Sequence, residues 1–132
     1  MAWDELRELA GRGVEVSSHT VSHPHLPTLS DAELADELRS SRQRLEDELG
    51  RPCRVLAYPY GECDERVRAA ARAAGYEAAF GLPGDPTGRD RFEVFRVGVW
   101  HGESPRRVAF KALPAVRSPV AIRLRRALGV TA

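Results

Sequence analysis

Short apolar segments alternate with amphipathic segments along this chain, and that alternation is what most limits the folds open to it. Strands are expected at 14–17, 54–57, 76–80 and 92–100, and helices at 3–10, 31–49, 65–74, from 105 onward and at 119–128. Strands separated by helices form βα units, which build a parallel sheet. About four strands are too few for a closed eight-stranded barrel, which needs roughly 250 residues. We therefore expect an α/β fold that is either a small open domain or a piece of a larger barrel.

Capping signals mark the expected helix boundaries. Ser30 and Glu33 form a capping box, in which a side chain at each position accepts from an early backbone N–H group. Leucines follow at helical spacing until Gly50 ends the helix: Leu34, Leu38, Leu45 and Leu49. Asp64 is a candidate N-cap for the next helix. The first element, at 3–10, is a helix rather than a strand, which indicates that something precedes it in a regular βα series.

The composition indicates a water-soluble globular chain. Of the 132 residues, 42% are hydrophobic and 30% are charged, which argues against both a disordered chain and a membrane protein. No apolar run reaches the roughly 20 residues that span a bilayer, and residues 1–5 lack the features of a signal peptide. Cys53 and Cys63 are too few for a disulfide framework. If the chain is complete, these features predict a cytoplasmic protein.

The net charge of +1 hides an uneven distribution. Seven of the 20 basic residues follow Glu103, and none of the 19 acidic residues does. We divide the chain into a domain at 1–115 and a basic C-terminal helix or tail at 116–132. A terminal helix packed on the domain is the favoured interpretation, and peripheral contact with an anionic membrane is the alternative. No nucleic-acid partner is expected, because no nucleic-acid motif or stacking platform lies beside the arginines.

The residues that could carry chemistry follow predicted strands. They are Ser18 to His25 after the first strand, Tyr58 to Gly61 after the second, and His101 with Gly102 after the last. The C-terminal ends of parallel strands share one face of a fold. We therefore expect these three loops to converge there.

His19 and His23 are the strongest candidates in that set. Neutral imidazole is a common zinc ligand, and two histidines four apart can reach one ion from a tight loop. Pro24 stiffens the loop, and the Thr20 hydroxyl can orient an imidazole or a loop carbonyl. His25 is interpreted as a loop residue rather than a third ligand. Because a catalytic zinc needs three protein ligands, the spacing alone leaves open a pair of loop histidines without a metal.

Two motifs in these loops carry a resemblance to a known family. His19-Thr20-x-x-His23-Pro24 is one, and residues 56–61, Leu-Ala-Tyr-Pro-Tyr-Gly, are the other. They resemble successive motifs of the polysaccharide deacetylases, the carbohydrate esterase family with the chitooligosaccharide deacetylase homology domain, in its Tyr-Pro-Tyr-Gly subgroup. The resemblance covers about residues 1–100. Both motifs in this order and at this distance are a strong signal.

The resemblance implies a deformed (β/α) barrel that holds a divalent metal, usually zinc, through one aspartate and two histidines. By position, His19 and His23 are the histidine ligands, Tyr60 offers its backbone N–H to the developing oxyanion, and Thr20 supports the loop. The implied reaction is metal-dependent hydrolysis of N-acetyl groups on the amino sugars of a poly- or oligosaccharide. Many members act in the cell envelope or outside the cell.

The chain departs from the family pattern at its start. The family's first motif, two neighbouring aspartates that supply a metal ligand and the general base, should precede residue 1, and Asp4 does not replace it. The chain thus resembles the later part of a barrel with its first strand or strands missing. Alone, it is expected to be weakly active or inactive. A catalytically degenerate metal- or glycan-binding module and an interaction fragment are the alternatives.

The remaining candidates lie around and beyond these motifs. His101 is the only late histidine and a candidate general acid or substrate contact. Arg96 resembles a late arginine that positions catalytic groups, with a plain strand-end arginine as the alternative. Pro59 belongs to the turn motif. Tyr58 and Trp100 are candidates for stacking on a sugar ring, although aromatic residues at strand ends are more often buried.

Overall fold

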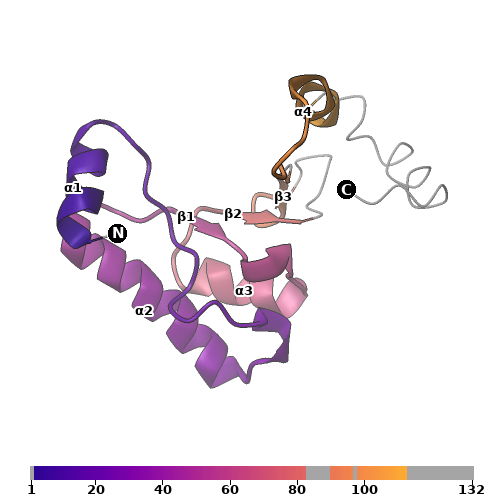
Figure 1. Cartoon of the computed structure of the whole chain (residues 1–132). Coiled ribbons are helices and arrows are strands. Elements are labelled where there is room, and N and C mark those ends of the chain that lie inside the picture. The colour runs from indigo at the N-terminus through magenta and orange to yellow at the C-terminus, as the bar shows by residue number, and fades with distance from the viewer. Residues whose placement is uncertain (1, 83–89, 97, 113–132) are drawn as a thin grey trace.

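The computed structural model describes residues 2–82, 90–96 and 98–112. Its helices are α1 (Trp3–Gly11), α2 (Asp31–Leu49), α3 (Glu65–Ala73) and α4 (Pro105–Ala112), and its strands are β1 (Val55–Ala57), β2 (Ala78–Gly81) and β3 (Val94–Phe95). Two 3-10 turns lie at Leu26–Thr28 and Pro59–Gly61. Figure 1 shows α2 and α3 on the same side of the sheet, with α4 beyond β3. No helix among these residues is long and apolar enough to cross a membrane.

The three strands form one parallel sheet in the order β1–β2–β3. Leu56 pairs with Ala79, and Phe80 pairs with Val94. Helix α3 connects β1 to β2, so these elements form the βα unit that alternating strands and helices build. The predicted α/β fold with a parallel sheet is confirmed.

Helix α2 forms where the capping signals predict it. The Ser30 hydroxyl accepts from the Glu33 N–H, the Glu33 carboxylate accepts from the Ser30 N–H, and Gly50 ends the helix in the left-handed conformation. Leu34 and Leu38 are fully buried, and each such side chain contributes roughly 1.5–3 kcal/mol. Their partners in the core come from the other elements: Leu26, Leu56, Tyr58, Val67, Ala71, Tyr76 and Ala79.

The predicted strand at 14–17 is wrong in its extent. The segment has no strand pairing of its own, and only the next residue, Ser18, is bridged to Leu56 of β1. The Ser18 N–H donates to the Val55 carbonyl over 3.0 Å, and the Ser18 carbonyl accepts from the Ala57 N–H over 2.9 Å. Alternation of apolar and polar residues predicts an extended backbone, but a strand also needs a neighbouring strand to pair with along its length.

The predicted strand at 92–100 is also wrong in its extent, because β3 spans only Val94–Phe95. The Asp90 carboxylate accepts from the Phe92 N–H over 2.8 Å, which makes a turn before β3. Strand β2 ends at Gly81, the residue that pairs with Phe95, so among the described residues β3 has no further pairing partner beyond Phe95. The residues at 98–100 are therefore irregular, and His101 does not follow a strand end.

Some predictions lie outside the described residues. The helix at 119–128 and the basic tail at 116–132 are among them, so the domain boundary and the membrane contact stay predictions. Cys53 and Cys63 are both free thiols.

Candidate functional site

The histidine loop, residues 18–25, is anchored at its base by a buried chain of hydroxyl groups. The Ser18 hydroxyl lies 2.9 Å from the Ser41 hydroxyl of α2 and accepts from the Thr20 N–H over 3.3 Å. The Ser41 hydroxyl in turn lies 3.1 Å from the Tyr76 hydroxyl, which donates to the Leu38 carbonyl. Buried polar groups are costly unless they are paired. This chain therefore fixes where the loop leaves the sheet.

Glu37 of α2 holds the middle of the histidine loop. Its carboxylate accepts from the backbone N–H groups of Val21 and Ser22 over 2.8 and 3.0 Å, and from the Ser22 hydroxyl. Burial acts to raise the pKa of the Glu37 carboxyl, but these hydrogen bonds outweigh it, so the pKa lies below its ordinary value. Glu37 is thus an ionised clamp on the loop.

His19 and His23 face each other across the loop. Their Nε2 atoms lie 3.1 Å apart, and their rings meet edge to face with centroids 4.7 Å apart. His19 Nδ1 lies 2.6 Å from the Ala57 carbonyl oxygen, which can only accept, so Nδ1 carries the proton. In the neutral ring, His19 Nε2 then carries a lone pair, which faces His23 Nε2 and is the kind of donor that binds a metal.

The backbone of the loop is held in an unusual conformation. Thr20 and His23 have φ values of 69° and 59°, in the left-handed region that side chains disfavour. The Thr20 hydroxyl accepts from the His23 N–H over 3.2 Å. Such strained residues gather at functional sites. Tyr60 is the only other residue with a side chain and a positive φ in the described part of the chain.

Tyr60 lies in the turn Pro59–Gly61 and has a φ of 56° there. Leu82 packs tightly against this turn at Gly61. Gly61 is required there, because a Cβ would lie 2.2 Å from the Leu82 Cβ and its φ is 75°. The Leu82 N–H donates to the Gly61 carbonyl over 2.9 Å. The Arg96 guanidinium donates to the Tyr58 carbonyl over 2.9 Å. No hydrogen bond to the Tyr60 N–H occurs within the residues that the structure describes.

The histidine loop and the Tyr60 turn meet through their rings. The Tyr60 ring contacts His23 edge to face at 4.7 Å and stacks on His25 at 4.0 Å, with only 8° between the planes. His25 Nδ1 lies 2.8 Å from a Glu62 carboxylate oxygen. The structure thus brings together His19, His23, Thr20 and Tyr60, which the sequence motifs single out.

Other candidates lie elsewhere. Tyr58 is fully buried, and its hydroxyl donates to the Phe92 carbonyl over 2.8 Å, so its ring packs in the core and is not available for stacking on a sugar. Burial raises the pKa of that hydroxyl. Pro59 is also buried. Trp100 is 61% exposed, and His101 is exposed with no hydrogen bond, ion pair or ring contact to the described residues.

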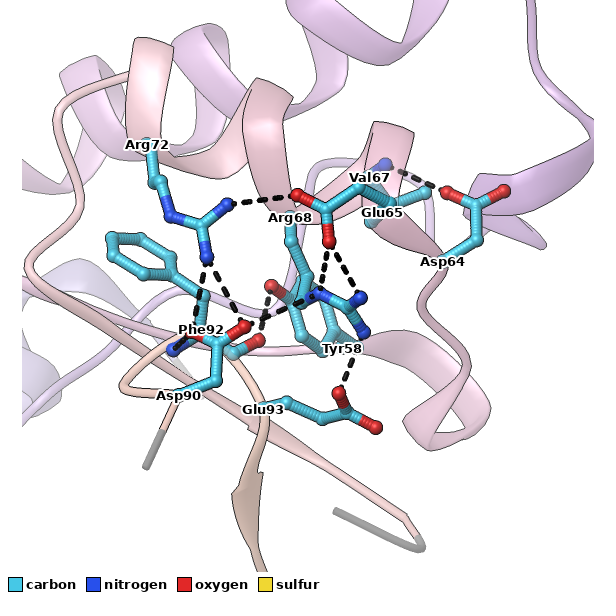
Figure 2. Close-up of polar contacts among 9 residues, drawn as sticks. All are labelled: Tyr58, Asp64, Glu65, Val67, Arg68, Arg72, Asp90, Phe92 and Glu93. Carbon is cyan, nitrogen blue, oxygen red and sulfur yellow. Dashed lines mark hydrogen bonds and ion pairs between the residues drawn. The ribbon is translucent and has the colours of Figure 1, made fainter. Parts of the chain in front are cut away.

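A cluster of ion pairs supports Tyr58 from the side of α3. Figure 2 shows Arg68 between Glu65, Asp90 and Glu93, at nitrogen–oxygen distances of 2.7, 3.3 and 2.6 Å. Arg72 pairs with Asp90 over 3.0 Å and lies over the Phe92 ring. We call these side chains the Arg68 cluster. It ties α3 to the segment that leads into β3, directly beside the Tyr58 hydroxyl.

Sequence reasoning missed two carboxylates, Glu37 and Glu62. Both reach the histidine loop from segments distant in the chain, and neither belongs to a motif. A signal for Glu37 exists, since it lies between Leu34 and Leu38 and is therefore near the buried face of α2. No group of three or more histidine, cysteine, aspartate or glutamate side chains suited to hold a metal occurs in the part of the chain that the structure describes.

Comparison with known proteins gives a consistent result. The family model for polysaccharide deacetylases matches residues 1–79. Chitin deacetylase 1 of Cryptococcus neoformans is 41% identical over 63 residues, which cover 48% of this chain and 13% of that protein. YxkH of Bacillus subtilis, which is named as a polysaccharide deacetylase, is 25% identical over 103 residues, 76% of this chain and 37% of that protein.

Solved structures with the same fold are also deacetylases. The Streptococcus pyogenes deacetylase PplD, in complex with acetate, matches 86% of this chain and 51% of its own with a TM-score of 0.78 and 20% identity. The polysaccharide deacetylase BC0361 of Bacillus cereus matches 84% of this chain and 36% of its own with a TM-score of 0.70 and 26% identity. The present chain therefore has the fold of part of a deformed (β/α) barrel, and it spans about half or less of the length of these relatives.

Proposed function

This chain belongs to the polysaccharide deacetylase family, and from that premise we propose that it carries part of the site of a metal-dependent hydrolase. The proposed reaction removes N-acetyl groups from the amino sugars of a poly- or oligosaccharide. The observation that carries the proposal is the facing pair of Nε2 atoms, 3.1 Å apart, with the His19 tautomer fixed by the Ala57 carbonyl. With the proton on Nδ1, the Nε2 atom of His19 keeps the lone pair that a metal would need.

His19 and His23 would hold the metal, and zinc suits their donor set. A bound divalent ion supplies a polarised acetamide carbonyl and a water of lowered pKa. The histidine pair fits this group because His19 presents its lone pair toward His23. A third ligand would come from residues other than those the structure describes, since no third donor joins the pair there.

Tyr60 would stabilise the developing oxyanion through its backbone N–H. That group has no hydrogen bond within the described residues, and the turn that carries it contacts two of the three loop histidines, His23 and His25. A positioned donor of this kind is worth roughly 3 kcal/mol in transition-state stabilisation. Thr20 supports the loop, and Arg96 holds the turn through the Tyr58 carbonyl. His101 and Trp100 remain proposed as acid and substrate contacts beyond β3.

Zinc affinity tests the proposal. We expect one zinc ion per chain, with affinity lowered more than about 100-fold in His19→Ala and in His23→Ala. The control is Val21→Ala, which removes an exposed side chain from the same loop. Equal zinc affinity in all four proteins would contradict the proposal.

A second candidate is a degenerate module that binds metal or glycan without turnover. The absence of a third metal-ligating side chain beside the pair, among the described residues, favours it. Acetate release from an N-acetylglucosamine oligomer separates the two, measured on the whole natural protein that carries this sequence. Release that is lost in His19→Ala supports the hydrolase, and zinc binding without release supports the module.

A further inference from the structure

We propose that His25 is a positioning residue that holds the Tyr60 backbone N–H in place by bridging the histidine loop and the Tyr60 turn. The inference rests on the proposed function, in which that N–H faces the developing oxyanion. The sequence predicts no more for His25 than a place in the loop, whereas the structure gives it two contacts with one turn. Those contacts are the Tyr60 ring and the Glu62 carboxylate.

Tyr60 needs such support. Its φ of 56° is strained for a residue with a side chain, and a strained conformation persists only where its surroundings determine it. Tyr60 is 50% exposed, so burial in the core does not hold it. Its recorded ring contacts among the described residues are His23 and His25. The near-parallel stack on His25, with 8° between planes, is the contact that covers a ring face.

Glu62 fixes the His25 ring in that stack. The carboxylate can only accept when ionised, so His25 Nδ1 donates to it over 2.8 Å. Glu62 lies two residues after Tyr60 in the sequence. His25 therefore contacts the turn at two residues, Tyr60 and Glu62, which lie on either side of Gly61. A ring held at both its face and its edge has little freedom to rotate.

His25 itself stands on a rigid base. Its carbonyl accepts from the Thr28 N–H over 3.0 Å and from the Thr28 hydroxyl over 2.8 Å. The next residue, Leu26, is fully buried in the core. The ring is thus placed by the backbone of the 3-10 turn rather than by the strained part of the loop.

The test follows the Tyr60 amide directly by NMR, in the full chain labelled with ¹⁵N-tyrosine. The sequence holds three tyrosines, so three signals are expected. The Tyr58 and Tyr76 amides donate to the Phe80 and Ala71 carbonyls and serve as internal controls for the fold. We expect His25→Ala to shift or broaden the Tyr60 signal alone. His25→Phe keeps a flat ring for the stack and should restore it.

Further variants separate positioning from a general loss of structure. Glu62→Ala removes the hydrogen bond but not the ring, and should move the Tyr60 signal in the same direction by less. Val21→Ala, on the same loop, should leave all three signals in place. A Tyr60 signal that is unmoved in His25→Ala overturns the proposal. If His25→Ala fails to fold, His25→Phe decides: a lost Tyr60 signal beside intact Tyr58 and Tyr76 signals overturns it.

Kinetics of the whole natural protein provide an independent measurement. His25→Ala should lower kcat for acetate release from an N-acetylglucosamine oligomer about 10-fold or more, because a small displacement of a catalytic group is costly. KM should change less than about twofold, and zinc affinity should stay at the wild-type value. Zinc affinity falling as far as kcat overturns the proposal. If the wild type releases no acetate, the proposed function fails, and the Tyr60 signal still decides the role of His25.

Discussion

The Arg68 cluster and the histidine loop are both polar, and they are built in opposite ways. In the Arg68 cluster, guanidinium and carboxylate groups contact one another, as Figure 2 shows, so charges are paired inside the cluster. In the histidine loop, supporting groups hold the backbone and one ring nitrogen, while the His19 and His23 Nε2 atoms contact only each other and the Tyr60 N–H has no hydrogen bond within the described residues. Charged groups that pair with one another stabilise a fold, whereas donors and acceptors that keep hydrogen-bonding capacity can bind a ligand.

The largest expected effect is a loss of zinc binding by the histidine loop while the Arg68 cluster and the stability of the fold are unchanged. His19→Ala should lower zinc affinity more than about 100-fold, since a ligand matters more than its supporting partners. The same variant should change the free energy of unfolding by less than about 0.5 kcal/mol, because His19 is exposed. Titration with zinc and chemical denaturation measure the two quantities. A large loss of stability in His19→Ala would show that the loop is part of the scaffold.

The converse variant breaks the cluster and spares the loop. Arg68→Ala should lower the free energy of unfolding by about 1–2 kcal/mol. The Arg68 side chain is only 18% exposed, and its removal takes away the ion-pair partner of Glu93. Zinc affinity should be unchanged. Arg54→Ala is the matched control, since its 3.5 Å pair with Glu77 is exposed and should contribute less than about 0.5 kcal/mol. Equal losses in both variants would contradict the buried role of Arg68.

Glu37 refines the comparison, because it is a charged residue of helix α2 that holds the backbone of the histidine loop. Glu37→Gln should weaken zinc binding about 10-fold by loosening the backbone at Val21 and Ser22. The pKa of Glu37 is lowered in the folded protein. Its stabilisation is therefore present above the unfolded value of about 4.3 and is lost as the pH falls below it. Glu33, Glu65 and Asp90 also have lowered pKa values, so unfolding measured against pH should show a smaller acid loss of stability in Glu37→Gln than in the wild type.

The smallest expected effect concerns backbone strain in the loop. Thr20→Asn should raise the free energy of unfolding by about 0.5 kcal/mol, because asparagine tolerates a φ of 69° better than a β-branched residue does. Its side-chain oxygen can still accept from the His23 N–H. Thermal unfolding measures the change. A decrease in Thr20→Asn would mean that threonine packing outweighs strain.

Local signals predict some elements well. Helix α2 is set by Ser30, Glu33 and Gly50, which lie next to it in sequence, and its boundaries follow them. The strand at 92–100 fails because its length depends on where β2 ends, at Gly81. No pattern within the strand itself records where a neighbour stops.

The candidate site shows the same division. The strand-end rule and the motifs bring His19, His23 and Tyr60 together, because parallel topology alone makes those loops neighbours. Their supports escaped prediction, since Glu37 and Glu62 are 16 and 37 residues from their partners in the loop. In the third expected loop, His101 makes no hydrogen bond, ion pair or ring contact with them among the described residues. The roles assigned to these residues stay predictions.

The hydrogen bond from His19 to residue 57 bears on which substitutions position 57 tolerates. The acceptor is a main-chain oxygen, so every amino acid at that position offers the same group. The imidazole tautomer is therefore indifferent to a substitution of Ala57. Such a substitution can change the size or charge of the side chain beside the histidine pair, while the acceptor for His19 Nδ1 stays in place.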